Sequence, residues 1–437
     1  MYGALPDHPG DFFKMIFGWH SDLDSDPLYK PYFEKIEKWG RADVTSDFFL
    51  NDNRTPIRLN ALIMVISFGK YAVHALMMLI LSFIGQYAFY KTFCIYFPKK
   101  ETILAAIIFV TPSVLFWTSG VLKEPIAMCL LGLFTYSYFK LFVHYQLKTK
   151  YIFLLLLSTA LFLIIKPYII VLILIPFILF AIVNRYSIKK VLLFYLTSLT
   201  IIYSIGILAL KFVFEKDVLN TIVVRQNDFV SLSKGGIFFI KDDKYVRLEY
   251  KDSAHYHLVD KEKQLFQFDR HSAFMYWNVH NLRDTIYETN NKDTSYFSMR
   301  AICAPSGSAI YIERLQYTLP SFAKLIPWSF YNVLCKPFFY DSCSVLELMA
   351  SMENLGFLLF FLLCFIFRDK LLVGRNLLVC CISIVIVSFI LIGITTTVTG
   401  AIVRYKVPFI PFLLMIPLLY LDSTIFKKIP FINRLVK

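Results

Sequence analysis

Charged residues that could do chemistry lie at the ends of the apolar segments of this chain. Lys123-Glu124, Lys166 and Arg404-Tyr405-Lys406 each adjoin a long apolar run. A guanidinium offers a planar set of donors that matches phosphate, and its charge is not lost by deprotonation. Lys123 could help to neutralise charge that develops on a departing phosphate, and Lys166 could add a further phosphate-binding cation. The residue types therefore indicate binding of a phosphate group.

The segment from Pro112 to Glu124 is expected to turn the chain between two apolar runs, presenting hydroxyls, a cation and a carboxylate. Glu124 precedes Pro125 at the start of a helix, where the macrodipole favours a carboxylate. A solvated turn anchored by Trp117 is the alternative. We assign Lys123 to phosphate binding and Glu124 to a supporting role.

Carboxylates gather in the N-terminal segment. A sugar transferase needs a carboxylate as general base, or as a metal ligand beside the leaving phosphate. The candidates in this segment are Asp7, Asp11, Asp22, Asp24 and Asp26, followed by Asp52 and Arg54 as supporting residues, and the spacing alone favours none of them. A divalent cation is an optional cofactor, although no residue is assigned as its ligand. A solvated acidic loop is the alternative.

The composition restricts the class of protein. Hydrophobic residues make up 57% of 437 residues and charged residues only 17%, which is too apolar for an ordinary soluble domain. The net charge of +14 comes mostly from short basic loops beside apolar runs, as membrane orientation requires. We therefore predict a lipid bilayer as the environment and no nucleic-acid partner.

Nine apolar segments approach the roughly 17 to 25 residues that cross a bilayer. Lys166-Pro167 should divide the long run from 151 to 183 into two helices, because proline cannot continue a helix. The chain is predicted to be an all-α polytopic membrane protein with about nine transmembrane helices. The segments are Tyr71 to Phe97, Thr102 to Trp117, Pro125 to Tyr145, Tyr151 to Ile165, Pro167 to Val183, Val191 to Phe214, Leu355 to Phe367, Asn376 to Val398 and Val407 to Leu421.

Alternation of these segments places most loop lysines and arginines on one side, which the positive-inside rule makes cytoplasmic. Residues 1 to 56 then lie outside, without an apolar signal core before them. We expect a further transmembrane helix upstream, with direct translocation of the N-terminal tail as the alternative. The predicted location is an inner, or cytoplasmic, membrane that the chain crosses several times.

Four regions follow from this topology. Residues 1–70 form an acidic extracytoplasmic loop with an interfacial helix, and 71–214 a transmembrane block of six spans. Residues 215–353 form a small extracytoplasmic insert, mainly β or irregular, and 354–437 three spans and a cytoplasmic tail. Alternation from Gly235 to Phe268 predicts a β-meander, and the aromatic stretch from Ser321 to Tyr340 predicts a helix in the membrane interface.

Several classes of function lose support. The sequence has no Walker A loop, no glycine-rich dinucleotide fingerprint and no Gly-x-Ser-x-Gly elbow. The eight cysteines lack the paired short spacings of a zinc site. No predicted span carries Asp or Glu in its middle, which makes an ion-coupled transporter the weaker class.

The motifs resemble those of GT-C-type polytopic membrane glycosyltransferases, relatives of the protein mannosyltransferases found in bacterial surface-polysaccharide loci. The resemblance rests on the external acidic loop, on the Pro-Ser-x-x-x-Trp-x-Ser-Gly-x-x-Lys-Glu stretch from Pro112, and on Arg-Tyr-x-x-Pro-x-x-Pro from Arg404. It implies a polyprenyl-phosphate-sugar donor, with Asp11 or its rival Asp7 acting on the acceptor. Arg404 and Tyr405 would lie near the lipid phosphate, and a first family helix is missing.

The leading hypothesis is an integral-membrane glycosyltransferase of cell-envelope glycan synthesis, acting on the extracytoplasmic face. Its partners would be a polyprenyl-phosphate-linked sugar and a glycan, lipid or protein acceptor. One alternative is an O-antigen-type polysaccharide polymerase. Another is a non-catalytic flippase or scaffold for lipid-linked glycans.

Overall fold

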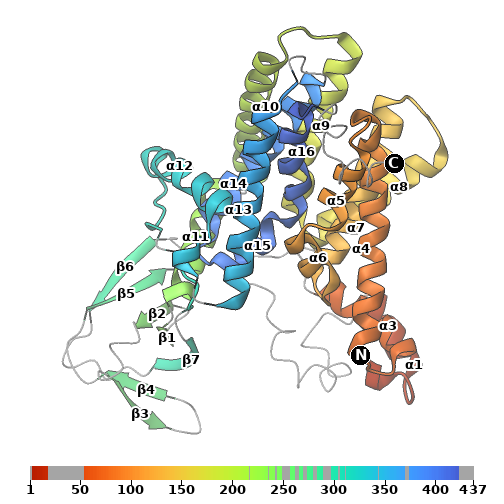
Figure 1. Ribbon diagram of the computed structural model, residues 1–437. Helices are drawn as coiled ribbons and strands as arrows, with labels where there is room; N and C mark the ends of the chain where they lie inside the picture. Colours follow the sequence, from red (N-terminus) through yellow and green to blue (C-terminus); the bar gives the residue numbers. More distant parts are fainter. Residues whose placement is uncertain are drawn as a thin grey trace. The chain divides into compact units, whose positions relative to one another are not determined.

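The computed structural model describes residues 2–17 and 54–422, with gaps at 216, 235, 242–243, 249–255, 261–264, 269–272, 279–282, 289–296, 304–305, 311, 343 and 370–373. The chain forms two compact units (Figure 1). The first comprises Met1–Leu199, Gly356–Val387 and Val407–Lys437, and the second comprises Thr200–Leu355 and Ser388–Lys406.

Helices make up the described part of the first unit. Three helices are divided between the two units: α10 (Val191–Val213), α13 (Val345–Ile366) and α14 (Arg375–Thr395). The helices wholly within the first unit are α1 (Pro9–Phe17), α3 (Arg54–Ser67), α4 (Tyr71–Phe93), α5 (Glu101–Phe109), α6 (Pro112–Ser119), α7 (Lys123–Tyr138), α8 (Thr149–Ile165), α9 (Pro167–Tyr186) and α16 (Ile410–Tyr420).

The helices have the lengths and composition of a polytopic membrane protein. Within the described residues, seven helical stretches are long and apolar enough to cross a bilayer. All nine predicted segments are helical, but two of them do not meet this test. The segment from Thr102 to Trp117 is divided into α5 and α6, which are bent by 45°, and the segment from Tyr151 to Ile165 lies in α8, which has only 17 residues. The predicted break at Lys166-Pro167 is confirmed, because α8 ends at Ile165 and α9 begins at Pro167.

Two predicted boundaries are wrong. The stretch after Pro112 is not a turn throughout, since Pro112–Ser119 forms α6 and α7 already begins at Lys123. Helix α13 begins at Val345, ten residues before the predicted span at Leu355. Glu347 and Glu353 therefore belong to a candidate membrane helix, and both are buried. The expectation of spans free of interior carboxylates is corrected accordingly.

Helix α7 lies in the core of the first unit. Most of its residues are buried, and it packs against α4 and α8. Beyond its C-terminus, the ring of Phe139 lies 5.3 Å from that of Phe93 and 5.2 Å from that of Phe177. Phe412 of α16 completes this aromatic cluster, with its ring 5.2 Å from that of Phe89.

The backbones of α4 and α7 touch where two glycines meet. A Cβ atom on Gly132 would collide with the backbone of Gly85, and one on Gly85 would collide with the backbone of Met128 and Cys129. Small residues allow such close crossings between membrane helices. These positions therefore require glycine for reasons of space.

We expect Gly132→Ala to destabilise the first unit by about 1–3 kcal/mol, because backbone cannot move aside as a flexible side chain can. The measurement is thermal unfolding of the purified protein in detergent. Gly206→Ala in α10 is the matched control, since nothing lies within 4 Å of a Cβ at Gly206. An unchanged melting temperature for Gly132→Ala would contradict the close crossing.

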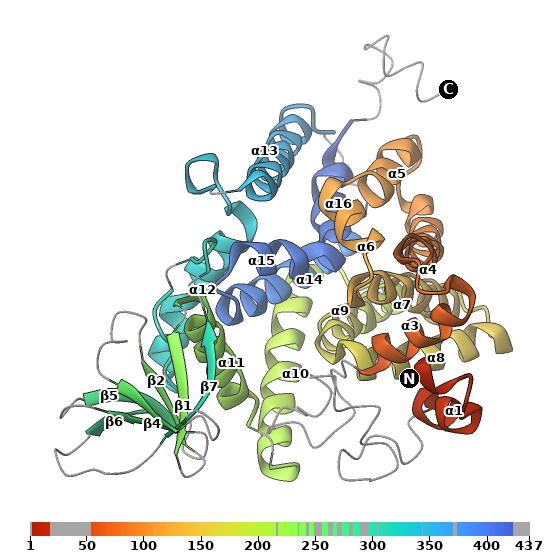
Figure 2. The same cartoon turned by 90° about the horizontal axis from the view of Figure 1, so that it is seen from below.

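The second unit combines helices with an antiparallel sheet. Its own helices are α11 (Val218–Lys234), α12 (Leu319–Cys335) and α15 (Thr399–Lys406). Figure 2 shows α11 beside the sheet that follows it. The strands are β1 (Gly236–Lys241), β2 (Lys244–Leu248), β3 (Tyr256–Asp260), β4 (Leu265–Phe268), β5 (Ala273–Asn278), β6 (Arg283–Glu288) and β7 (Phe297–Cys303).

The strand order is β3-β4-β7-β1-β2-β5-β6. Strands occur where the alternating pattern predicted them, but they do not form a simple meander. The last strand, β7, lies between the β1–β2 and β3–β4 hairpins and pairs with both β1 and β4. The sequence pattern could not predict this, because alternation identifies strands and not their partners.

Candidate functional site

A cleft of about 480 Å³ opens beside α12 in the second unit. Its volume lies within the range of small-molecule sites. Three pieces of chain form it: the segment 310–313, the helix α12 and the turn that follows α12. The lining residues are Ile310, Ile312, Glu313, Lys324, Leu325, Trp328, Tyr331, Asn332, Lys336 and Tyr340.

Exposed aromatic rings are prominent in this cleft. Trp328 is 61% exposed and Tyr340 is 81% exposed. The rings of Trp328 and Tyr331 meet edge to face at 6.1 Å. Residues 324, 328 and 331 share one face of α12 because they follow helical spacing. The sequence predicted this helix as an interfacial one, but it did not predict a cleft.

Polar groups accompany the rings. The ammonium of Lys324 lies 2.8 and 2.7 Å from the two carboxylate oxygens of Glu313, at the surface. The side chain of Asn332 is buried and lines the cleft, and Lys336 lies one turn further along. The cleft thus presents donors and acceptors next to flat apolar surfaces.

The segment carrying Glu313 is fixed by hydrogen bonds to its backbone groups. Gln226 of α11 donates from Nε2 to the carbonyl oxygen of Glu313 at 2.7 Å and accepts at Oε1 from the N–H of Leu315 at 3.1 Å. The N–H of Ile310 donates to the carbonyl oxygen of Thr397 at 2.7 Å. A fully buried glutamine therefore holds this wall of the cleft.

The turn after α12 is fixed by Asn354 of α13. Its Nδ2 donates to the carbonyl oxygens of Cys335 and Pro337, at 3.2 and 3.4 Å. Its Oδ1 accepts from the ammonium of Lys406 at 2.7 Å. Burial raises the pKa of the Cys335 thiol, although the charge of Lys406 opposes this shift. The thiol is therefore a packing group and not an activated nucleophile.

Helix α15 is attached to the same framework at its start. The hydroxyl of Thr399 donates to the buried carboxylate of Glu347. The N–H of Thr399 donates to the carbonyl oxygen of Ser308 at 3.0 Å. Glu347, which precedes the predicted span at Leu355, thus takes part in holding α15.

The Arg404-Tyr405-Lys406 motif forms the end of α15. Lys406 is buried, whereas Arg404 is half-buried. Two residues correspond to about 200° around a helix, so the two cations point to opposite sides. Tyr405 is half-buried, and its ring lies 6.4 Å from that of Phe229. Lys406 therefore belongs to the buried hydrogen-bonded network around Asn354, whereas Arg404 lies on another face of α15.

Lys166 and Glu124 form a buried ion pair in the first unit. Lys166 connects α8 to α9, and its Nζ lies 2.8 Å from Oε1 of Glu124 in the first turn of α7. Their side chains are 5% and 0% exposed. Lys166, predicted as an additional phosphate-binding cation, is thus buried and neutralises a carboxylate. Lys123, the first residue of α7, is half-buried.

The predicted acidic residues lie near the chain start. Asp7 is exposed in the turn before α1, and Asp11 is half-buried in its first turn. Asp52 lies outside the described residues, and Arg54 begins α3. Within the part of the chain that the structure describes, no three or more His, Cys, Asp or Glu residues are placed to hold a metal ion.

Comparisons of the chain with protein-family models, with curated proteins and with solved structures found no match. The interpretation of the site therefore depends on its residues alone.

Proposed function

We propose that this protein is an integral-membrane glycosyltransferase that moves a sugar from a polyprenyl-phosphate donor on the extracytoplasmic face of a bacterial cytoplasmic membrane. The observation that carries the proposal is the cleft beside α12, in which exposed aromatic rings lie next to paired charges. In this proposal the cleft receives the glycan acceptor.

The chemistry of a sugar ring fits these surfaces. A pyranose has apolar C–H faces and a rim of hydroxyl groups. Trp328 and Tyr340 offer flat apolar surfaces with polar edges. Glu313 and Asn332 can accept hydrogen bonds from hydroxyls, and Lys324 can donate them. A purely lipid-facing helix would have no need of the Glu313–Lys324 pair.

The reaction would be an inverting transfer. A carboxylate removes the proton of an acceptor hydroxyl, the new C1–O bond forms, and the bond from C1 to the phosphate oxygen breaks. The resemblance assigns the base to Asp11, with Asp7 as its rival. Arg404, with Tyr405 beside it, would balance the charge that develops on the departing polyprenyl phosphate. Lys123 remains a second candidate for that role.

We expect Trp328→Ala and Tyr340→Ala each to lower kcat/KM for the acceptor by roughly 10-fold or more, because a stacked ring contributes about 1 kcal/mol beyond its buried area. The measurement is sugar transfer by purified protein in liposomes that contain a polyprenyl-phosphate-sugar extract.

Tyr71→Ala is the matched control, since Tyr71 is an exposed tyrosine at the start of α4. Transfer that is unaffected by both cleft substitutions would exclude the cleft as the acceptor site. A complete lack of transfer by the wild type with every donor in the extract would contradict the proposed transferase activity.

A flippase for lipid-linked glycans is the second candidate. The buried carboxylates Glu347 and Glu353 in a candidate membrane helix favour it, because ionisable groups at such positions commonly mark a transport path. The two functions differ in the fate of the donor. Movement of an intact lipid-linked sugar between leaflets, with no loss of sugar from the lipid, would favour the flippase.

A further inference from the structure

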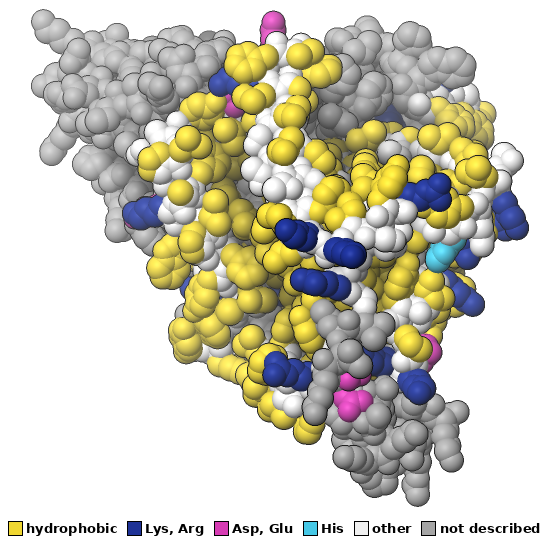
Figure 3. Space-filling model, turned by 90° about the horizontal axis from the view of Figure 1, so that it is seen from above, with side chains coloured by type: hydrophobic (Ala, Val, Ile, Leu, Met, Phe, Trp, Pro, Cys, Tyr) yellow, Lys and Arg dark blue, Asp and Glu magenta, His cyan; other side chains and the backbone are white. Residues whose placement is uncertain are grey.

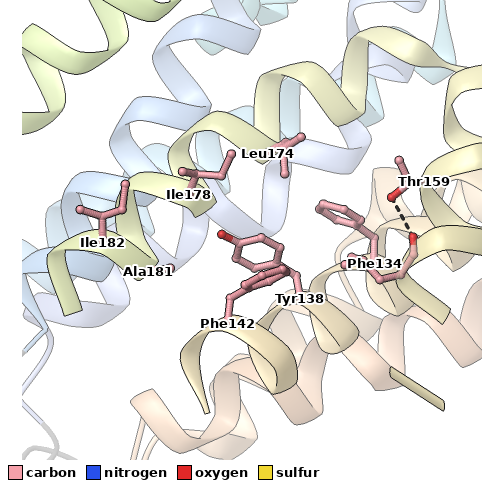
Figure 4. Close-up of a pocket in the computed structure, with 9 residues that line it drawn as sticks. Phe134, Tyr138, Phe142, Thr159, Leu174, Ile178, Ala181 and Ile182 are labelled. Atoms are coloured by element: carbon pink, nitrogen blue, oxygen red, sulfur yellow. Dashed lines mark hydrogen bonds between the residues drawn. The ribbon is translucent and has the colours of Figure 1, made fainter. Parts of the chain in front are cut away.

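A second cavity, of about 440 Å³, lies among α7, α8 and α9 in the first unit. Figure 4 shows Phe134, Tyr138 and Phe142 on one side and Leu174, Ile178 and Ile182 on the other. These residues extend over about 12 Å of each helix, since eight residues separate the first from the last. The cavity is therefore an elongated groove along the helices.

The groove is apolar at its base and open at its edge. Phe134 and Tyr138 are buried, whereas Phe142 and Ile178 are exposed. The hydroxyl of Thr159 donates to the carbonyl oxygen of Leu155, within its own helix, at 2.7 Å. The lining thus favours a hydrocarbon chain over a polar ligand.

A π-helical turn shapes one end of this groove. Residues Phe139–Val143 continue α7 as a π-helix. Such turns are rare and are frequent at functional sites. The ring of Tyr138, just before the turn, lies 4.9 Å from the ring of Phe142, which is within the turn. The turn thus brings two aromatic rings together in the wall of the groove.

The same end of the groove is basic. Arg185 follows Ile182 by three residues, so the two share a face of α9. Its guanidinium lies 5.4 Å from the ring centre of Tyr145. Lys140 lies in the π-helical turn on another face from Tyr138 and Phe142, and its ammonium lies 5.5 Å from the ring centre of Tyr136. The chain has no Asp or Glu between Glu124 and Glu215, so carboxylates from these three helices do not offset this charge.

Arg185 lies in the last turn of α9, a helix long and apolar enough to cross a membrane, and the end of such a span is where headgroups are expected. Helix α9 ends at Tyr186, and the groove runs along it from Leu174 to Ile182. Burial, together with the charge of Lys140, lowers the pKa of His144, so the positive charge at neutral pH comes from lysine and arginine. Figure 3 shows basic side chains set among hydrophobic ones on the face seen from above.

We propose that this groove binds an anionic glycerophospholipid. One acyl chain lies between α7 and α9, and the phosphate lies at Arg185, with Lys140 adding positive charge to the same end of α7. The positive-inside rule explains basic residues at this end, but it does not require a groove or a π-helical turn beside them. An arginine fork matches a phosphate that carries a single negative charge. The site is separate from the proposed transferase cleft and does not depend on it.

The test compares lipid retention by native mass spectrometry after exchange into mild detergent. We expect phosphatidylglycerol to be retained at least about 5-fold better than phosphatidylcholine by the wild type. Ala181→Trp, which fills the groove, should lower the retention of phosphatidylglycerol by a similar factor. The double variant with Lys140→Gln and Arg185→Gln should lose the preference for the anionic lipid.

Leu193→Trp on an exposed position of α10 is the control for added bulk, and Lys99→Gln is the control for lost charge. Equal retention of the two lipids by the wild type would overturn the proposal. An unchanged preference in the double variant would do so too, and this variant alters no packed core residue. Displacement by equimolar polyprenyl phosphate would instead assign the groove to the donor lipid.

Discussion

Glu124→Gln is expected to destabilise the protein by about 3–5 kcal/mol, because it leaves the ammonium of Lys166 buried without its countercharge. The ion pair joins the start of α7 to the connection between α8 and α9, 42 positions later in the chain. We expect the melting temperature in detergent to fall on the order of 10 °C. Lys166→Met should have an effect of similar size, since it isolates the carboxylate.

The double variant Glu124→Leu with Lys166→Met is the decisive control. Replacing both members of a buried pair with apolar residues is often neutral or stabilising. We therefore expect the double variant to be more stable than either single variant. A loss of stability in the double variant equal to the sum of the losses in Glu124→Leu and Lys166→Met alone would show that the residues do not interact.

Lys406→Met is expected to cost about 3 kcal/mol, which is the second largest effect. The substitution removes the hydrogen bond to Asn354 and the electrostatic attraction of Glu353. Asn354 also holds the turn that lines the cleft, so acceptor binding should weaken together with stability. The measurements are thermal unfolding and the KM for the acceptor.

Arg404→Met provides the matched comparison. Because Arg404 is half-buried on another face of α15, we expect its loss to change the melting temperature much less. Under the proposed function it should instead lower kcat, since its charge is assigned to the donor phosphate. Equal loss of stability in both variants would show that the two cations have the same structural role.

The apolar segments could be predicted because each depends on neighbouring residues. A long apolar run predicts a helix, and a proline predicts a break, without reference to the rest of the chain. The division between α8 and α9 at Pro167 is such a case. The start of α13 at Val345 could not be predicted in this way, because its first turns carry Glu347 and Glu353 and read as a soluble segment.

The cleft depends on contacts that no local pattern predicts. Gln226 and Glu313 are 87 positions apart, and Lys406 and Asn354 are 52 positions apart. The sequence identified Lys406 as a member of a charged motif, but not its amide partner. A polar amide in a largely apolar helix, such as Asn354, was the feature of the sequence that could have indicated these contacts, since a buried amide needs hydrogen-bond partners.

The contact between Gly85 and Gly132 also restricts the order in which this protein can be assembled. The ribosome completes α4 before α7, with α5 and α6 between them. Until α7 is made, the final packing partner of Gly85 does not yet exist. Early intermediates in synthesis would therefore be vulnerable to pairing of α4 with another helix.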